Sequence, residues 1–272
     1  MNLLILSSST GGGHEMRANA LKSWWTEGKG EARILRPLEN GFKLYRWGTS
    51  LYNLIQKNLP LFHYLYFYFL EYASLHRGPR RIIGSKNLLS EVKDFSPDLV
   101  LSVHAHLNHG YFRLIRDCLP AQKGKFVIFC GELDDGHGFS RHWINPDADL
   151  FAGPFEETCQ AAVRRGMPEK KTMATGPLLR KAFYGKAGQS DREDFLRKYG
   201  LSDSLKTYVL GTGANGVNRH REVIDAFDRS GDRCQLLALC GKNEVTLAEL
   251  NRMKDRVKVP FMALPELSAP EM

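Results

Sequence analysis

Two glycine-rich turns, each placed directly after a short apolar run, are the segments of this chain best suited to ligand chemistry. The first turn is 7–14 (SSSTGGGH), and the apolar run before it is 2–6. Gly11, Gly12 and Gly13 allow a tight backbone turn and let a ligand approach the amides. A helix that follows would aim the positive end of its dipole at the turn. The turn lacks the spacing of a GxGxxG fingerprint and of a P-loop.

His14 closes this first turn and is a candidate general base. At the positive end of a helix the protonated form of an imidazole is disfavoured, and a neutral imidazole can accept a proton. The alternative is a phosphate-binding turn in which His14 only packs or caps. The residues alone do not separate these two interpretations.

The second turn, 211–216 (GTGANG), follows the apolar run 207–210, and a related turn (CGKNE) begins at Cys240. Backbone amides of such turns at the carboxyl ends of strands suit a diphosphate. Glycine-rich turns in two successive α/β domains predict a cleft with one ligand on each wall.

A histidine cluster follows the apolar run 98–103 and resembles a metal-binding motif in its spacing. His104, His106 and His109 have the HxHxDH spacing of the metallo-β-lactamase fold, with Asn108 in place of the Asp. Clustered imidazoles can bind zinc. That fold begins with antiparallel strands, whereas this chain opens with a βαβ rhythm. We therefore expect no metal site, with one histidine lining a cleft and the others packed or at the surface.

A polar loop, 131–143 (GELDDGHGFSRHW), follows an apolar run that ends at Cys130. Acidic and imidazole groups at the carboxyl end of a strand are plausible site residues. Glu132, His142 and Trp143 are the candidates from this loop. The alternative is a polar surface loop.

An aromatic and basic stretch, 42–72, is the candidate membrane contact. Its densest apolar run, 61–70, is too short to span a bilayer, but aromatic and basic side chains together suit the headgroup region of an anionic membrane. The alternative is an aromatic-rich pair of core helices. The residues expected to touch the membrane are Trp47, Tyr52, Phe62, Phe67, Arg80 and Arg81.

The elements that must position these residues alternate between short apolar runs and helical patterns, which predict a helix from about Glu15 to Trp25 and a last strand from Val257 to Met262. This rhythm predicts parallel sheets of the doubly wound type. Residues 177–189 lack periodicity, so we predict one domain over 1–180 and another over 190–272. The second segment predicts only about three strands, which favours a truncated second domain over a small complete one.

Composition is that of a globular protein, with 43% hydrophobic and 25% charged residues. The net charge of +8 indicates an anionic partner, either nucleic acid, a membrane surface or a phosphorylated substrate. The 5 cysteines form no CxxC pair, and no signal peptide or membrane span is recognisable. We expect a cytoplasmic protein that is peripheral on the membrane.

Taken together, these segments resemble the monogalactosyldiacylglycerol synthase family. The resemblance rests on TGGGH at 10–14, PDLVLSVH at 97–104 and HWINPDADLFAGPFEET at 142–158. The segment 166–183 (GMPEKKTMATGPLLRKAF) and the turns GTGANG and CGKNE match as well. The matching segments occur in the family's order and extend over nearly the whole chain.

The resemblance implies a GT-B fold with two Rossmann-like doubly wound domains, the second apparently truncated. It also implies an inverting transferase that moves galactose or glucose from UDP-galactose or UDP-glucose to diacylglycerol, with His14 as catalytic base and no cofactor, metal or nucleic acid. On the acceptor side we place Gly11, Gly12, Gly13, Glu132, His104, His142 and Trp143. On the donor side we place Gly211, Gly213, Asn215, Gly216, Asn243 and Glu244.

The sequence departs from the family pattern in one dipeptide of the proposed site. The family typically has Thr-Asp where this chain has Gly131-Glu132, and the family's donor-binding motif would lie beyond residue 272. The alternatives are a MurG-like transferase with another lipid acceptor, a metal-dependent hydrolase using His104, His106 and His109, and a non-catalytic lipid- or nucleotide-binding fragment.

Overall fold

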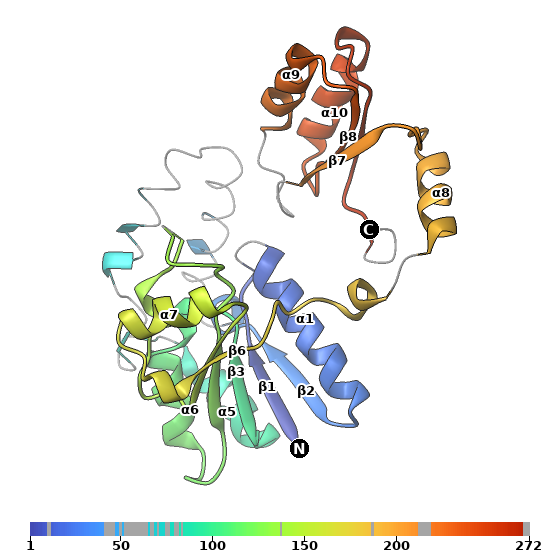
Figure 1. Ribbon diagram of the computed structural model, residues 1–272. Helices are drawn as coiled ribbons and strands as arrows, with labels where there is room; N and C mark the ends of the chain where they lie inside the picture. The colour runs from blue at the N-terminus through green and yellow to red at the C-terminus, as the bar shows by residue number, and fades with distance from the viewer. Residues whose placement is uncertain are drawn as a thin grey trace. The chain divides into compact units, whose positions relative to one another are not determined.

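The computed structural model of the chain describes residues 1–9, 12–40, 47–48, 51, 65, 68–69, 71–73, 77–78, 82, 84–136, 138–185, 188–211 and 219–268. These residues divide into two compact units, and the chain passes from the first to the second between Lys181 and Ala182. Figure 1 shows both units along the chain.

The first unit contains a parallel sheet of six strands in the order β2-β1-β3-β4-β5-β6. The crossover from β2 back past β1 to β3 is the switch point of a doubly wound sheet. The strands are β1 (Asn2–Leu6), β2 (Glu31–Leu35), β3 (Leu99–Ser102), β4 (Lys125–Phe129), β5 (Leu150–Gly153) and β6 (Thr172–Ala174).

Helices connect these strands. The α-helices described in this unit are α1 (Gly12–Glu27), α2 (Pro37–Asn40), α5 (Ser85–Phe95), α6 (Gly110–Cys118) and α7 (Glu156–Arg164). The short 3-10 helices are η2 (Ala105–Leu107), η3 (Arg141–Trp143), η4 (Glu169–Lys171) and η5 (Lys181–Tyr184), the last of which crosses into the second unit.

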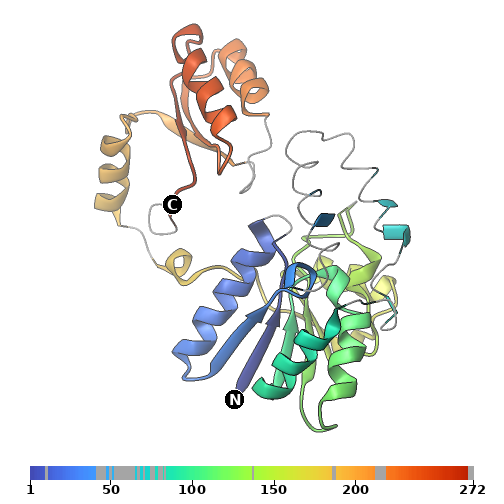
Figure 2. The ribbon, with the colours of Figure 1, turned by 180° about the vertical axis from the view of Figure 1, so that it is seen from behind.

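Strand β1 shows why this sheet forms, because its side chains are buried on both faces. Leu3 and Ile5 pack in one hydrophobic cluster with Ala18 of α1. Leu4 and Leu6 point the other way, into a larger cluster that includes residues of α5, α6 and α7. A parallel strand covered on both faces is apolar along its buried length, as residues 3–6 of this one are. Figure 2 brings α5 (teal) and α6 (green) into view.

The second unit contains a smaller parallel sheet, with the strand order β7-β8-β9. Its described elements are α8 (Gln189–Lys198), β7 (Lys206–Gly211), α9 (His220–Ser230), β8 (Cys234–Leu239), α10 (Glu244–Met253), η6 (Lys254–Arg256) and β9 (Phe261–Leu264). One hydrophobic cluster joins β8 to Ile224 of α9 and Leu250 of α10. On the opposite face, Leu237 is buried but Val209 is 59% exposed.

The predicted fold class is confirmed as α/β with two parallel sheets, the second smaller than the first. Strand β2 was missed because its sequence, EARIL, is short and two of its five residues are charged; it lies at the edge of the sheet with its charged residues exposed. Helix α1 begins at Gly12, inside the glycine run and earlier than the expected start at Glu15. Strand β9 begins at Phe261, later than the expected Val257.

Candidate functional site

The candidate site residues of the first unit gather at one edge of its sheet. In a parallel sheet all carboxyl ends lie at the same edge, and ligands of open α/β sheets bind there. His14 follows β1, His104 follows β3 and Glu132 follows β4, so the topology alone brings these three together.

His14 lies in the first turn of α1, and its ring is fixed by the backbone. Its Nδ1 is 2.6 Å from the carbonyl oxygen of Val103. A carbonyl oxygen can only accept, so Nδ1 carries the proton and the neutral ring keeps its lone pair on Nε2. Burial, and then the neighbouring Arg17, lower the pKa of His14 to about 4. At neutral pH the ring is therefore a neutral proton acceptor at Nε2.

Other histidine rings extend in a row from His14. The ring centroids are 4.5 Å apart for His14 and His104, 5.6 Å for His104 and His106, and 4.6 Å for His106 and His142. His104 is buried and caps η2, because its Nδ1 accepts a hydrogen bond from the backbone N–H of His106. Burial, and then Arg77, lower the pKa of His109, at the end of the row, to about 4.

No metal site is present among the residues that the structure describes. Within them, no group of three or more His, Cys, Asp or Glu side chains could hold a metal ion. The imidazoles of the row contact one another through their rings instead of converging on one point. One of them, His104, lies against His14, and the others continue away from it.

A charged pair and an indole form the next layer of the site. Arg17, one helical turn after His14, donates from Nη2 to the carbonyl oxygen of Gly131 at 3.0 Å. Burial raises the pKa of Glu132, opposed by Arg17 and by a hydrogen bond from Trp143. The buried Trp143 also lies 6.4 Å from His14 between ring centroids. This arrangement links His14, Arg17, Glu132 and Trp143.

Gly131 lies where a side chain would meet Arg17. A Cβ atom built on Gly131 would lie 1.9 Å from Cζ of Arg17. Any larger residue would therefore displace the guanidinium. Sequence reasoning missed Arg17, although its spacing of three residues from His14 on a predicted helix places the two side chains on one face.

Glu71 is a second residue that sequence reasoning missed. Its carboxylate accepts from Ser140 Oγ at 2.6 Å and from the backbone N–H of Arg141 at 2.6 Å. Nε2 of His142 lies 3.2 Å from the Glu71 carbonyl oxygen. The described residues 71–73, within the long segment 41–83, are thereby attached to the turn that carries His142 and Trp143. No local sequence pattern indicates this pairing, because the partners are about seventy residues apart.

On the donor side, the structure describes only part of the predicted set. Gly211 is the last residue of β7, whereas Gly213, Asn215 and Gly216 fall in 212–218, outside the described residues. Asn243 is the N-cap of α10, where its Oδ1 accepts from the backbone N–H of Thr246 at 3.2 Å. Glu244 is the exposed first residue of that helix.

The predicted membrane-contact residues lie mostly outside the described part. Tyr52, Phe62, Phe67, Arg80 and Arg81 are not described. Trp47 is described and is 65% exposed. Other exposed apolar side chains of the same stretch are Leu65, Tyr68, Phe69 and Tyr72. Among the helices that the structure describes, none has the length and apolar character needed to cross a membrane.

Comparison with known sequences shows that this chain is similar to one group of enzymes. No protein-family model matches it. Monogalactosyldiacylglycerol synthase of Spinacia oleracea is 21% identical over 271 residues, covering 94% of this chain and 51% of that protein. A probable monogalactosyldiacylglycerol synthase of Glycine max is 23% identical, covering 94% and 50%. Monogalactosyldiacylglycerol synthase 2 of Arabidopsis thaliana is 21% identical, covering 95% and 57%. The chain thus spans about half the length of these relatives.

Comparison with solved structures identifies the fold. Anabaena HepE in complex with UDP-glucose superposes with a TM-score of 0.59 at 12% identity, covering 100% of this chain and 71% of that one. A glycosyltransferase from Rickettsia africae gives a TM-score of 0.57 at 11% identity, covering 99% and 69%. By fold this chain is thus an α/β protein of the GT-B glycosyltransferase type, and by sequence it is similar to the monogalactosyldiacylglycerol synthases.

Proposed function

We propose that this protein transfers galactose or glucose from a UDP-sugar to the hydroxyl of diacylglycerol, with inversion at the anomeric carbon. The observation that carries the proposal is the state of His14: Nδ1 donates to Val103, and Nε2 holds the lone pair. The similarity to monogalactosyldiacylglycerol synthases over 94% of the chain supports the lipid acceptor. The fold shared with HepE, which was solved with UDP-glucose, supports the donor.

In the proposed reaction, Nε2 of His14 takes the proton of the acceptor hydroxyl as its oxygen attacks the anomeric carbon. The new C–O bond forms while the bond to the UDP oxygen breaks, and UDP leaves with the electron pair. The Val103 carbonyl, bound to Nδ1–H, stabilises the imidazolium that results. A pKa of about 4 makes His14 a weak base in the free protein. The negative charge of a bound diphosphate would raise that pKa and strengthen the base.

The acceptor wall in this proposal consists of residues around His14. Gly12 and Gly13 would leave room beside the base for the incoming hydroxyl, and Gly11, which belongs to the same predicted set, lies outside the described residues. Trp143 and His104 are buried against the His14 ring and would fix its orientation behind the acceptor. Glu132, held by Trp143 and Arg17, is the polar group that would orient the glycerol hydroxyls, and His142 continues this surface.

The donor wall in this proposal belongs to the second unit. The turn that begins at Gly211 and the N-terminal turn of α10 both follow carboxyl ends of strands. Backbone amides there would stabilise the UDP leaving group. Asn243 would hold the N-terminal turn of α10 in place through its capping hydrogen bond. Glu244 would contact the sugar or the ribose. No cofactor or metal is needed for this reaction scheme.

The membrane part of the proposal concerns residues 42–81. The exposed side chains of Trp47, Tyr68, Phe69 and Tyr72 would enter the headgroup region of an anionic membrane, and the net charge of +8 would add attraction. The protein would then work in the cytoplasm as a peripheral membrane protein, where its lipid acceptor is available. Nucleic acid has no part in this scheme.

The test is a transfer assay with radiolabelled UDP-galactose or UDP-glucose and dioctanoylglycerol in mixed micelles. We expect His14→Gln to lower the rate by at least about 100-fold, because the base is lost. Binding to lipid vesicles should survive this change. His106→Gln is the matched control from the same histidine row and should keep a rate close to that of the unmodified protein.

Turnover that is unchanged in His14→Gln would remove His14 as the base. Absence of glycolipid with either donor would contradict the transferase itself.

A further inference from the structure

A short part of the first unit turns its charged residue inward and its apolar residues outward. Tyr72 is 74% exposed, whereas the side chain of Glu71 next to it is 15% exposed. This is the reverse of the arrangement expected in water, where carboxylates face the solvent and aromatic side chains are buried. Such exposed apolar side chains mark a surface that meets another apolar phase. We call these residues the exposed set: Leu65, Tyr68, Phe69 and Tyr72.

The inward-facing Glu71 is attached to the turn that leads into η3. Its Oε2 accepts from Ser140 Oγ and its Oε1 from the backbone N–H of Arg141, each at 2.6 Å. Its carbonyl oxygen accepts from Nε2 of His142 at 3.2 Å and from Nη2 of Arg141. Hydrogen bonds to a carboxylate are strong, and a carboxylate this buried would be costly without them. These bonds join the exposed set to residues 140–142.

The turn that Glu71 contacts continues directly into the acceptor wall. Ser140 Oγ also accepts from the backbone N–H of His142 at 3.1 Å, which caps η3. Trp143, the last residue of η3, is buried with its ring centroid 6.4 Å from that of His14. The position of Glu71 thus sets where the exposed set lies relative to the proposed base.

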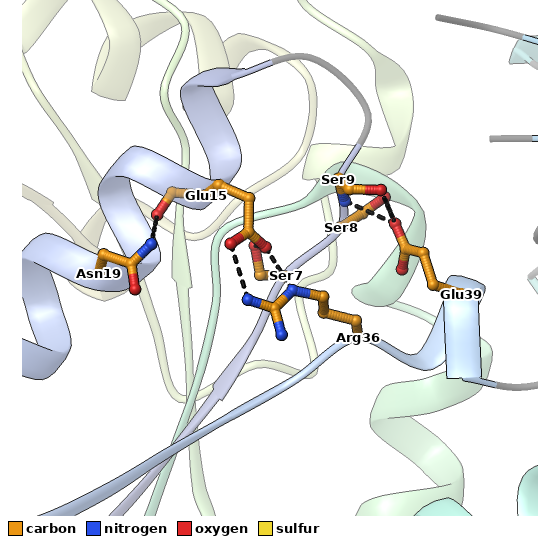
Figure 3. A network of polar contacts seen from close by, with 7 residues as sticks. All are labelled: Ser7, Ser8, Ser9, Glu15, Asn19, Arg36 and Glu39. Atoms are coloured by element: carbon orange, nitrogen blue, oxygen red, sulfur yellow. Dashed lines mark hydrogen bonds and ion pairs between the residues drawn. The ribbon is translucent and has the colours of Figure 1, made fainter. Parts of the chain in front are cut away.

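His14 itself is held by contacts that do not involve Glu71. Its neighbour Glu15 receives both arms of Arg36, with Nε 2.6 Å from Oε1 and Nη2 2.8 Å from Oε2 (Figure 3). Ser7 Oγ lies 3.5 Å from Oε1 of the same carboxylate. These contacts attach the first turn of α1 to the ends of β1 and β2. Loss of the Glu71 carboxylate should therefore leave the base in place.

We propose that Glu71 is a positioning residue for transfer at a membrane, because it fixes the exposed set to the turn before Trp143. In the proposed function, on which this inference rests, the acceptor lies in an anionic membrane. Tyrosine rings suit the headgroup region, and so does the guanidinium of Arg141, whose Cζ is 5.6 Å from the Tyr72 ring centroid. Once the exposed set has inserted, Glu71 keeps His14 at a fixed distance from the lipid hydroxyls.

The first test compares an acceptor embedded in a membrane with a dissolved one. Glu71→Ala should lower the transfer rate on phosphatidylglycerol vesicles containing diacylglycerol at least about tenfold, the effect of losing one hydrogen bond to a charged group. With dihexanoylglycerol dissolved as a monomer, kcat should stay close to that of the unmodified protein. Glu71→Gln should recover most of the vesicle rate, because its amide can still accept from Arg141 and donate to Ser140.

The control for the first test is Glu91→Ala, which removes an exposed carboxylate from α5 and should change neither rate. A fall of both rates by the same factor in Glu71→Ala would overturn the inference, because it would show that Glu71 serves the fold or the base alone. Equal vesicle rates for Glu71→Ala and the unmodified protein would overturn it too.

The second test needs no turnover and uses the unmodified protein. Hydrogen exchange of the Arg141 amide reports its bond to Glu71 Oε1 directly. Phosphatidylglycerol vesicles should slow this exchange at least about tenfold, because insertion of the exposed set restricts local opening. The matched control is the Phe126 amide, which also donates to a carboxylate, that of Asp149 at 2.8 Å, and should exchange at an unchanged rate.

Vesicles that bind but leave the Arg141 exchange unchanged would overturn the inference, even if Glu71→Ala does not fold. Absence of vesicle binding would overturn it as well. Slowed Arg141 exchange in a protein that transfers no sugar would contradict the proposed transfer reaction and leave the role of Glu71 at the membrane intact.

Discussion

The two sheets of this protein differ in how their strands are covered, and the difference bears on their candidate sites. Strand β1 in the first unit has hydrophobic clusters on both faces, one with α1 and one with α5, α6 and α7. Strand β7 in the second unit packs Tyr208 and Leu210 against one cluster and leaves Val209 exposed. The interior strand β1 is therefore covered on both faces, whereas β7, an edge strand of its sheet, is covered on one face by the described residues.

The same contrast appears where the strands end. After β4, Gly131 lies directly under the guanidinium of Arg17, with no space for a side chain. At the end of β7, no atom of the described residues lies within 4 Å of the position that a Cβ of Gly211 would take, apart from its chain neighbours. Both glycines lie at the carboxyl end of a strand, but they have different roles. Gly131 leaves room for the buried guanidinium of Arg17, and Gly211 is the last residue of an edge strand.

The largest expected effect is on the buried leucines. Leu4 in the first sheet and Leu236 in the second are both 0% exposed, so Leu→Ala at either position should cost about 2–5 kcal/mol. Val209→Ser should change stability by no more than about 0.5 kcal/mol. Urea denaturation with peptide-resolved hydrogen exchange reports each sheet separately. A cost at Val209 equal to that at Leu236 would mean that β7 is covered on both faces, and would remove the contrast.

A smaller effect is expected at the two glycines. Gly131→Ala must move the end of the Arg17 side chain, which donates a hydrogen bond to the Gly131 carbonyl oxygen, and should cost about 1 kcal/mol. Gly211→Ala should be neutral to within about 0.5 kcal/mol. Thermal unfolding measures both.

Arg17→Ala supplies the control for Gly131→Ala. Adding Arg17→Ala to Gly131→Ala should recover part of the lost stability, because the clash is with that side chain. A double variant no more stable than Gly131→Ala would assign the cost to the backbone of residue 131.

Sequence patterns predicted the parts of the fold that depend on local rules. Continuous apolar runs such as Leu3 to Leu6 indicate strands buried on both faces, and these predictions are confirmed. Strand β2 was missed because an edge strand with charged residues has no such run. The N-terminal start of α1 was placed too late because glycine is a poor helix former, yet Gly12 and Gly13 lie in its first turn.

The candidate site was predictable where it depends on strand order and was missed where it depends on distant partners. Residues after β1, β3 and β4 could be placed at one edge from the βαβ rhythm alone. Glu71 could not, because nothing in the aromatic and basic stretch 42–72 indicates its pairing with Ser140 and Arg141. The bond from His14 to Val103 joins residues 89 apart in the chain, so the tautomer could not be read from the sequence.

The central claim is that His14 is a neutral base with its lone pair on Nε2. Because burial and Arg17 lower its pKa to about 4, the unfolded chain binds more protons than the folded protein between pH 6.5 and 4. Stability should therefore fall as pH decreases through that range, by about 1.4 kcal/mol for each pH unit from this residue.

The most direct measurement is ¹⁵N NMR of the histidine rings as a function of pH, with His14→Gln used to assign the signals. The account predicts that His14 carries its proton on Nδ1 at pH 7 and titrates with a pKa of about 4. A pKa at or above 6.5, or a proton on Nε2 at pH 7, would contradict it.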